Sequence, residues 1–151
     1  MFLISGVAHN GVSRIDVEGQ EVLVIGAGAI GLLATSVAKA LGASRVIIAD
    51  INAERLQLAK KMGADATINC KEVDLHSEVM RLTQNNGVSR LVEASGASPL
   101  VNTCFKLLQK VRYLTTGLYS ARHQCTLRSS SLVNYFSVEI FWVQRNRSYI
   151  V

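Results

Sequence analysis

A glycine-rich turn and an acid that follows it are the features of this sequence most typical of a ligand-binding site. The turn reads Gly26-Ala27-Gly28-Ala29-Ile30-Gly31, and Asp50 ends the next apolar run. In a GxGxxG turn the first glycine permits a sharp corner, the second lets a phosphate approach the backbone, and the third lets a helix pack closely on a strand. The turn and its Ile30 therefore predict a site for the pyrophosphate of a dinucleotide at a helix N-terminus.

Asp50 favours one dinucleotide over another. A carboxylate at the end of the second strand accepts hydrogen bonds from the hydroxyls of the adenosine ribose and repels a 2′-phosphate. Ile51 beside it offers no cation for such a phosphate. We therefore expect NAD rather than NADP as the cofactor. Arg55 leaves a choice open, because its side chain could reach the adenine edge or, less favourably, a phosphate.

Two other glycine-rich phosphate loops are excluded by residue identity. A P-loop requires Gly-Lys-Ser or Gly-Lys-Thr, which the turn lacks. A methyltransferase-type GxGxG turn requires a glycine at the position of Ile30. An ordinary strand-to-helix turn is the remaining alternative.

Strands and helices are expected to alternate around the turn. Apolar runs predict strands at residues 21–26, 45–50, 65–69, 87–94, 113–118 and 138–143, and periodicity with capping residues predicts helices at 30–41, 53–62, about 75–84, from Pro99 to Leu108, and 130–136. This alternation predicts an α/β fold, a single domain with a Rossmann-type doubly wound parallel sheet in the order 3-2-1-4-5-6. Ligands bind at the carboxyl ends of such strands, so Ser95, Gly117 and Leu118 are expected to border the cofactor.

Composition sets limits on the class of protein. We expect residues 1–18 to form an incomplete N-terminal segment, residues 19–143 an NAD-binding domain, and residues 144–151 a basic tail. The apolar fraction of 49% and the charged fraction of 18% are ordinary for a globular protein. Because the chain has no apolar run of membrane-spanning length and no basic signal-peptide start, we expect a cytoplasmic protein without a membrane partner.

The net charge of +5 lies in the last third of the chain, where six basic residues from Lys110 onward face a single acid, Glu139. No nucleic-acid motif accompanies them, so we interpret them as a solvated face or one that meets another domain, and do not expect a nucleic acid partner. The cysteines Cys70, Cys104 and Cys125 form no CxxC pair, and we predict no metal site.

Four segments together resemble the nucleotide-binding domain of zinc-containing medium-chain dehydrogenases/reductases, the alcohol dehydrogenase superfamily, in its sorbitol and threonine dehydrogenase branch. They read GQEVLVIGAGAIGLLA, VIIADINAERLQLAKKMGADATIN, VEASGA and TTGLYS. The resemblance implies that Asp50 binds the adenosine ribose and that Arg55 lies against the adenine. It also implies that the glycine turn approaches the pyrophosphate, and that Ser95 and Gly117-Leu118 border the nicotinamide half.

The resemblance further implies an activity, hydride transfer between a secondary alcohol and NAD, with zinc polarising the alcohol oxygen. The family carries its zinc ligands in a preceding catalytic domain, which we expect this chain to lack. We therefore name no catalytic residue or metal ligand, and expect a separate catalytic domain as a partner. The family's sixth strand often pairs across a dimer, which implies a homo-oligomer. The chain departs from the family at Ser89-Arg90, where an acid is usual, and at Val111, where glycine is common.

Three functions remain open at this point. The first is the cofactor domain of an NAD-dependent polyol or alcohol dehydrogenase, inactive by itself. The second is a non-catalytic NAD(H)-binding or redox-sensing module. The third is a basic interaction protein, or a decayed gene fragment, that has lost cofactor binding.

Overall fold

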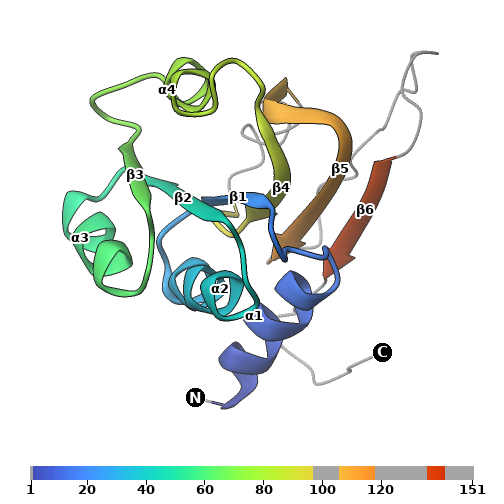
Figure 1. Cartoon of the computed structure of the whole chain (residues 1–151). Helices are drawn as coiled ribbons and strands as arrows, with labels where there is room; N and C mark the ends of the chain where they lie inside the picture. The colour runs from blue at the N-terminus through green and yellow to red at the C-terminus, as the bar shows by residue number, and fades with distance from the viewer. Residues whose placement is uncertain (1, 97–105, 118–135, 142–151) are drawn as a thin grey trace.

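A computed structural model describes residues 2–96, 106–117 and 136–141 of the chain, with side chains described for residues 5–96 and 106–107. The elements follow one another as α1 (Phe2–Ser13), β1 (Glu21–Ile25), α2 (Ala29–Ala40), β2 (Arg45–Asp50), α3 (Ala53–Lys61), β3 (Ala66–Asn69), α4 (Leu75–Leu82), β4 (Val88–Glu93), β5 (Leu108–Gly117) and β6 (Phe136–Phe141) (Figure 1). None of the described helices is long and apolar enough to cross a membrane.

Four strands form a parallel sheet in the order β3-β2-β1-β4. β1 lies between β2 and β4, pairing Ile25 with Ala49 on one side and with Glu93 on the other. Strands β2 and β3 therefore follow β1 on one side, and β4 returns to its other side. The strand order changes direction between β1 and β4, and such folds bind ligands at this switch point. The expected α/β class, with this Rossmann-like order, is confirmed.

The backbone of β5 and β6 continues the parallel pairing beyond β4. Leu108, expected on a helix, is the first residue of β5 and pairs with Val88, so this strand begins before the expected Tyr113. The register shifts between Val88 and Arg90, so the early start depends on contacts with β4 that no local pattern reveals. β6 likewise begins at Phe136, expected to end a short helix. The helix start expected at Pro99, the rest of the helix expected at residues 130–136, and Leu118 lie outside the described residues.

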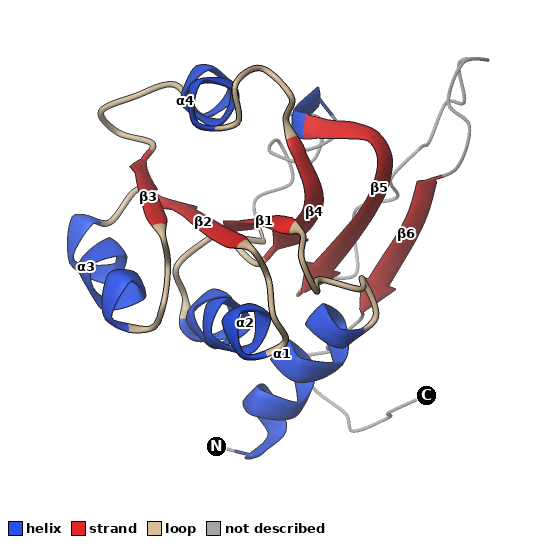
Figure 2. Cartoon of the chain, viewed as in Figure 1, coloured by secondary structure: helices blue, strands red, loops and turns tan. Residues whose placement is uncertain are grey.

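The core consists of one apolar layer on each face of the sheet. Along β1 the side chains alternate, so Val22 and Val24 pack under α1, α2 and α3, while Leu23 and Ile25 pack under α4. Figure 2 shows α1, α2 and α3 on one side of the strands and α4 on the other. The sheet is therefore covered on both faces, as near-continuous apolar strands predict.

The segment before β1 contributes to this core. Val12, Ile15 and Val17 are almost fully buried against the layer that contains α2. The segment is held from the sheet side by Arg90 of β4, whose Nε donates to the carbonyl oxygen of Ile15 and, at 2.9 Å, to that of Asp16. Arg90 is itself 7% exposed. The buried guanidinium of Arg90 is therefore satisfied by backbone carbonyl groups.

Candidate dinucleotide-binding site

The turn between β1 and α2 has a shape that requires glycine. Gly26 has a φ of +97°, and a Cβ there would lie 2.7 Å from the backbone nitrogen of Ser95. A Cβ at Gly31 would lie 1.8 Å from the carbonyl oxygen of Gly26. Both positions thus exclude a side chain, the first because the turn touches the exit of β4 and the second because α2 packs directly on the turn.

Gly28 differs from these two glycines because space lies open beside it. No heavy atom of the described residues, its chain neighbours aside, lies within 4 Å of the place that a Cβ would take. Gly28 is the N-cap of α2 and provides no side-chain cap, whereas Asn52 caps α3 and Asp74 caps α4 through their side chains. The N–H groups that open α2, including those of Ala29 and Ile30, are therefore left for an acceptor from outside the helix.

Asp50 links the end of β2 to the glycine turn. Its Oδ2 accepts a hydrogen bond from the backbone N–H of Ala27 at 2.5 Å, and its Oδ1 accepts one from the backbone N–H of Asn52 at 2.8 Å. A carboxylate has about four acceptor sites, so each oxygen retains capacity for a further donor. Asp50 can therefore hold the turn and still accept from ribose hydroxyls.

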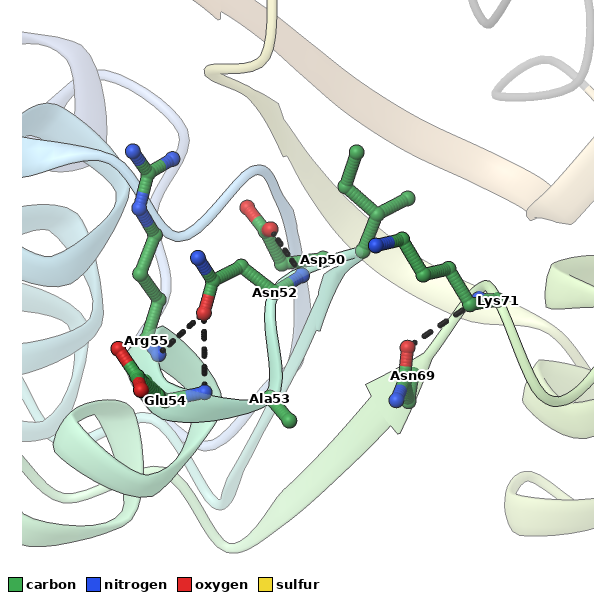
Figure 3. Close-up of a pocket in the computed structure, with 8 residues that line it drawn as sticks. Asp50, Asn52, Ala53, Glu54, Arg55, Asn69 and Lys71 are labelled. Carbon is green, nitrogen blue, oxygen red and sulfur yellow. Dashed lines mark hydrogen bonds between the residues drawn. The ribbon is translucent and has the colours of Figure 1, made fainter.

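A pocket of about 580 Å³ opens beside Asp50, at the carboxyl ends of β2 and β3 (Figure 3). Ile51 is 60% exposed there, an apolar surface against which an adenine ring could lie. The first turn of α3 forms another wall. The lining residues are Asp50, Ile51, Asn52, Ala53, Glu54, Arg55, Asn69 and Lys71.

The exit of β4 is held by a buried acid, Glu93, which is 0% exposed. Its Oε1 accepts from the backbone N–H of Ser95 at 2.8 Å and from the Ser95 hydroxyl. Its Oε2 is buried and, in the part of the chain that the structure describes, has no hydrogen-bond partner. Glu93 therefore determines how Ser95 meets Gly26. Of the residues expected at the next strand exit, Gly117 ends β5 and Leu118 is not described.

Cys70 lies beside the pocket, between Asn69 and Lys71, and is half-buried. Burial, reinforced by the carboxylates of Asp50 and Asp74, raises the pKa of the Cys70 thiol. The thiolate form of Cys70 is therefore disfavoured at neutral pH.

Most of the residues that the sequence singles out come together at the carboxyl ends of the strands. Gly26 and Gly28 lie in the turn, and Ile30 and Gly31 lie in the first turn of α2. Asp50 bonds to the turn and Ser95 lies against it, while Ile51 and Arg55 line the adjoining pocket. Sequence reasoning missed Asn69 and Lys71, which line the same pocket. The rule that ligands bind at carboxyl ends of parallel strands, applied to the third strand, would have indicated them.

An open α/β sheet with an uncapped glycine turn and an acid at the end of the second strand defines the class of dinucleotide-binding domains. The profile of the zinc-binding dehydrogenase family matches residues 29–149. The chain belongs to that family, and the matched region corresponds to the family's NAD(P)-binding domain.

Known proteins of several sources are similar to this chain. It is 37% identical to an L-threonine 3-dehydrogenase of Pyrococcus horikoshii over 128 residues, which are 84% of this chain and 36% of that protein. It is 41% identical over 95 residues to an L-threonine 3-dehydrogenase of Escherichia coli, covering 63% and 28% of the two chains. Alcohol dehydrogenase TADH from Thermus sp. ATN1 superimposes with a TM-score of 0.82 at 28% identity, covering 91% of this chain and 40% of its own. The chain thus spans about a third of the length of the curated relatives that it matches.

The name of the family implies zinc, and the described residues do not fit it. Among residues 5–96 and 106–107, no group of three or more His, Cys, Asp or Glu side chains is placed to hold a metal ion. The glycine turn and the pocket beside Asp50, in contrast, have the shape and donors that a dinucleotide requires.

Proposed function

We propose that this chain is the NAD(H)-binding domain of a zinc-type alcohol or polyol dehydrogenase, which transfers hydride between a secondary alcohol and NAD. The bound nicotinamide ring would supply the hydride acceptor, and the zinc chemistry would require a catalytic domain outside the described residues. The names of its relatives, L-threonine 3-dehydrogenase and alcohol dehydrogenase, support an alcohol as the substrate class. The domain would comprise residues 19–143, with residues 144–151 as a basic tail.

The proposal assigns each predicted residue a place along the dinucleotide. Asp50 would accept from the adenosine ribose, with Ile51 and Arg55 against the adenine. The pyrophosphate would lie at the glycine turn, held by free N–H groups and the positive end of α2. Ser95, Gly117 and Leu118 would border the nicotinamide half. The charge of Asp50 supports NAD over NADP, since it repels a 2′-phosphate.

We further propose that all six strands belong to one sheet of the cofactor-binding domain. The pairing of β4 with β5 and of β5 with β6 supports the complete doubly wound order 3-2-1-4-5-6. β6 is the last strand of the sheet within the described residues, and its outer side would associate with a second copy of the chain. Sedimentation at increasing concentration would test that homo-oligomer.

The observation that carries the proposed function is the open, uncapped start of α2 at Gly28, one residue from the N–H that Asp50 holds. We expect NADH fluorescence to titrate to saturation with the unsubstituted chain and Gly28→Val to abolish the titration, because the valine side chain would occupy the phosphate position. The variant should remain folded by circular dichroism, since its Cβ meets no atom of the described residues and φ is negative.

Gly6→Val is a matched control. Gly6 lies on α1, has equally open space beside it and is outside the pocket, so this variant should bind NADH like the parent. Normal NADH titration by a folded Gly28→Val variant would contradict the placement of the phosphates.

A further inference from the structure

The end of β4 contains a carboxyl group to which the proposed cofactor contacts give no role. Glu93 pairs with Ile25 of β1 on one side and with Thr116 of β5 on the other, so it lies within the sheet at its carboxyl edge (Figure 1). It is 0% exposed, and within the described residues its Oε2 has no hydrogen-bond partner. A buried polar oxygen without a partner lowers stability, and an apolar side chain in its place avoids this loss. The role of Glu93 must therefore lie in what its other oxygen, Oε1, holds.

Glu93 Oε1 holds one residue by two of its groups. It accepts from the backbone N–H of Ser95 at 2.8 Å and from the Ser95 hydroxyl. Two donors on one acceptor fix both the backbone of Ser95 and the direction of its side chain. The N–H of Ala94 donates to the carbonyl oxygen of Ile25 at 2.7 Å, which holds the same segment to β1. These three hydrogen bonds therefore determine the path along which the chain leaves β4.

That path runs along the glycine turn. A Cβ at Gly26 would lie 2.7 Å from the backbone nitrogen of Ser95 and 2.8 Å from its Cα, so the two backbones lie directly against each other. On its other side the turn is bonded to β2, because the Gly26 N–H donates to the carbonyl oxygen of Ala49 at 2.7 Å. The turn is therefore confined between the ends of two strands, and the position of one of them depends on Glu93.

We propose that Glu93 is a positioning residue of the cofactor site, which holds Ser95 against Gly26 and so keeps the glycine turn in the shape that receives the pyrophosphate. Glu93 itself touches no part of the dinucleotide, and its effect on binding passes through Ser95. Hydrogen bonds from N–H groups to a phosphate depend on direction, so a small displacement of the turn weakens several of them together. This inference rests on the proposed function, since it assumes that the pyrophosphate lies at the turn.

The test separates cofactor binding from stability with two substitutions of similar size in the full chain. Glu93→Leu removes the acceptor for both Ser95 donors, whereas Glu93→Gln retains that acceptor as its amide oxygen. Urea denaturation should show that Glu93→Leu is folded, because leucine fills the buried space. Fluorescence titration should give this variant an NADH dissociation constant about tenfold above that of the parent. Glu93→Gln should bind NADH like the parent.

Competition against NADH shows which part of the ligand is affected. ADP carries the pyrophosphate without the nicotinamide half, and it should lose affinity for Glu93→Leu by a similar factor. Adenosine lacks phosphates and should bind the variant and the parent equally. Ser95→Ala removes one of the two donors to Glu93 and should weaken ADP binding by a smaller factor, so it tests the inference even where Glu93→Leu does not fold.

Leu91→Val is the matched control. Leu91 is fully buried on the same strand, so the shorter side chain should lower stability while NADH binding stays at the parental level. Parental affinity for NADH and ADP in a folded Glu93→Leu variant, or parental affinity for ADP in Ser95→Ala, would overturn the inference and leave the proposed function intact. Equal losses for ADP and adenosine, or an equal loss in Leu91→Val, would also contradict it, because they would indicate a general effect of stability. A parent chain that binds neither NADH nor ADP would refute the proposed function and this inference together.

Discussion

At the scale of single residues, Asp50 has two structural tasks at once. It holds the N–H of Ala27 in the glycine turn and lines the pocket where a ribose would lie. Asp50→Ala should weaken NADH binding about tenfold or more, because both the ribose acceptor and the restraint on the turn are lost. For NADPH, the substitution also removes the repulsion between Asp50 and the 2′-phosphate. The difference between the NADH and NADPH dissociation constants should therefore narrow.

Titrations of Asp50→Ala with NADH and with NADPH measure this change in the ratio of the two dissociation constants. An unchanged preference between the nucleotides would show that another residue selects the cofactor. The expectation that Asp50 is the acid of the site follows from local sequence, since it ends an apolar strand at the required spacing. The hydrogen bond that Asp50 accepts from the Ala27 N–H does not follow from local sequence, because the two residues meet only when β1 and β2 pair.

Glu93 provides a second test at this scale, concerning stability. Glu93→Ala removes the acceptor of both Ser95 hydrogen bonds and empties a fully buried position, so we expect a loss of about 2–3 kcal/mol in the free energy of unfolding. Glu54→Ala, at an exposed acid on α3, should change it by less than about 0.5 kcal/mol. Urea denaturation measures both, and equal losses would disprove a structural role for Glu93.

At the scale of elements, one buried cation adds to the apolar packing that holds α1. The guanidinium of Arg90 holds the carbonyls of Ile15 and Asp16 just beyond the end of α1. Arg90→Ala removes the donor to both carbonyls and leaves that of the buried Ile15 unpaired, so we expect it to cost about 2–3 kcal/mol in the free energy of unfolding. Amide hydrogen exchange should accelerate mostly in α1.

A control for this variant is Arg14→Ala, which removes an exposed arginine at the end of the same helix, bonded to Asn10 by its Nε at 3.1 Å. Its unfolding free energy should change by well under about 1 kcal/mol. Uniform acceleration of exchange across the sheet after Arg90→Ala would mean that Arg90 supports the whole domain rather than α1.

Element boundaries show how far local patterns reach. β2 covers the expected residues 45–50, and α3 ends within a residue of its predicted end, because apolar runs, the Asn52 cap and Gly63 are all short-range signals. The start of β5 at Leu108 was not predicted, since that strand begins with an irregular pairing to Val88. The apolar spacing that ends at Leu107 and Leu108 fits a helix, and only the pairing of Leu108 with Val88 of β4 shows that a strand begins there.

At the scale of the whole molecule, Asp65 joins three elements. Its Oδ2 accepts from the N–H of Val46 at 2.6 Å, and both its oxygens lie 3.1 Å from Lys39 Nζ of α2. Burial works to raise the pKa of Asp65, but the hydrogen bonds from Val46 and Lys39 and the nearby positive charges lower it overall. The charged form is therefore favoured in the folded state.

The lowered pKa of Asp65 determines the direction in which the free energy of unfolding changes with pH. The unfolded chain, with an aspartate pKa of about 3.9, binds a proton at a higher pH than the folded chain does, so the stabilisation by Asp65 is complete at neutral pH. It should be lost progressively as the pH falls below about 5, through the unfolded and then the folded pKa. The free energy of unfolding, measured against pH by urea denaturation, should fall less steeply in Asp65→Asn than in the parent.

Among the described residues, the pKa values of Asp74 and Glu78 are also lowered. Both acids remain in the Asp65→Asn variant, so the difference between the two curves isolates Asp65. Parallel curves for the two proteins down to low pH would show that Asp65 carries no pH-dependent stabilisation.

The α/β class, the glycine turn and the acid at the end of the second strand could be predicted from the sequence, because each depends on residues within a few positions of one another. The contacts of those residues could not: Ser95 lies against Gly26, Arg90 binds carbonyls beyond the end of α1, and Lys71 shares a pocket with Asp50. Parallel strands bring together exits that are distant in the chain, and no short-range pattern records which side chains then share a pocket.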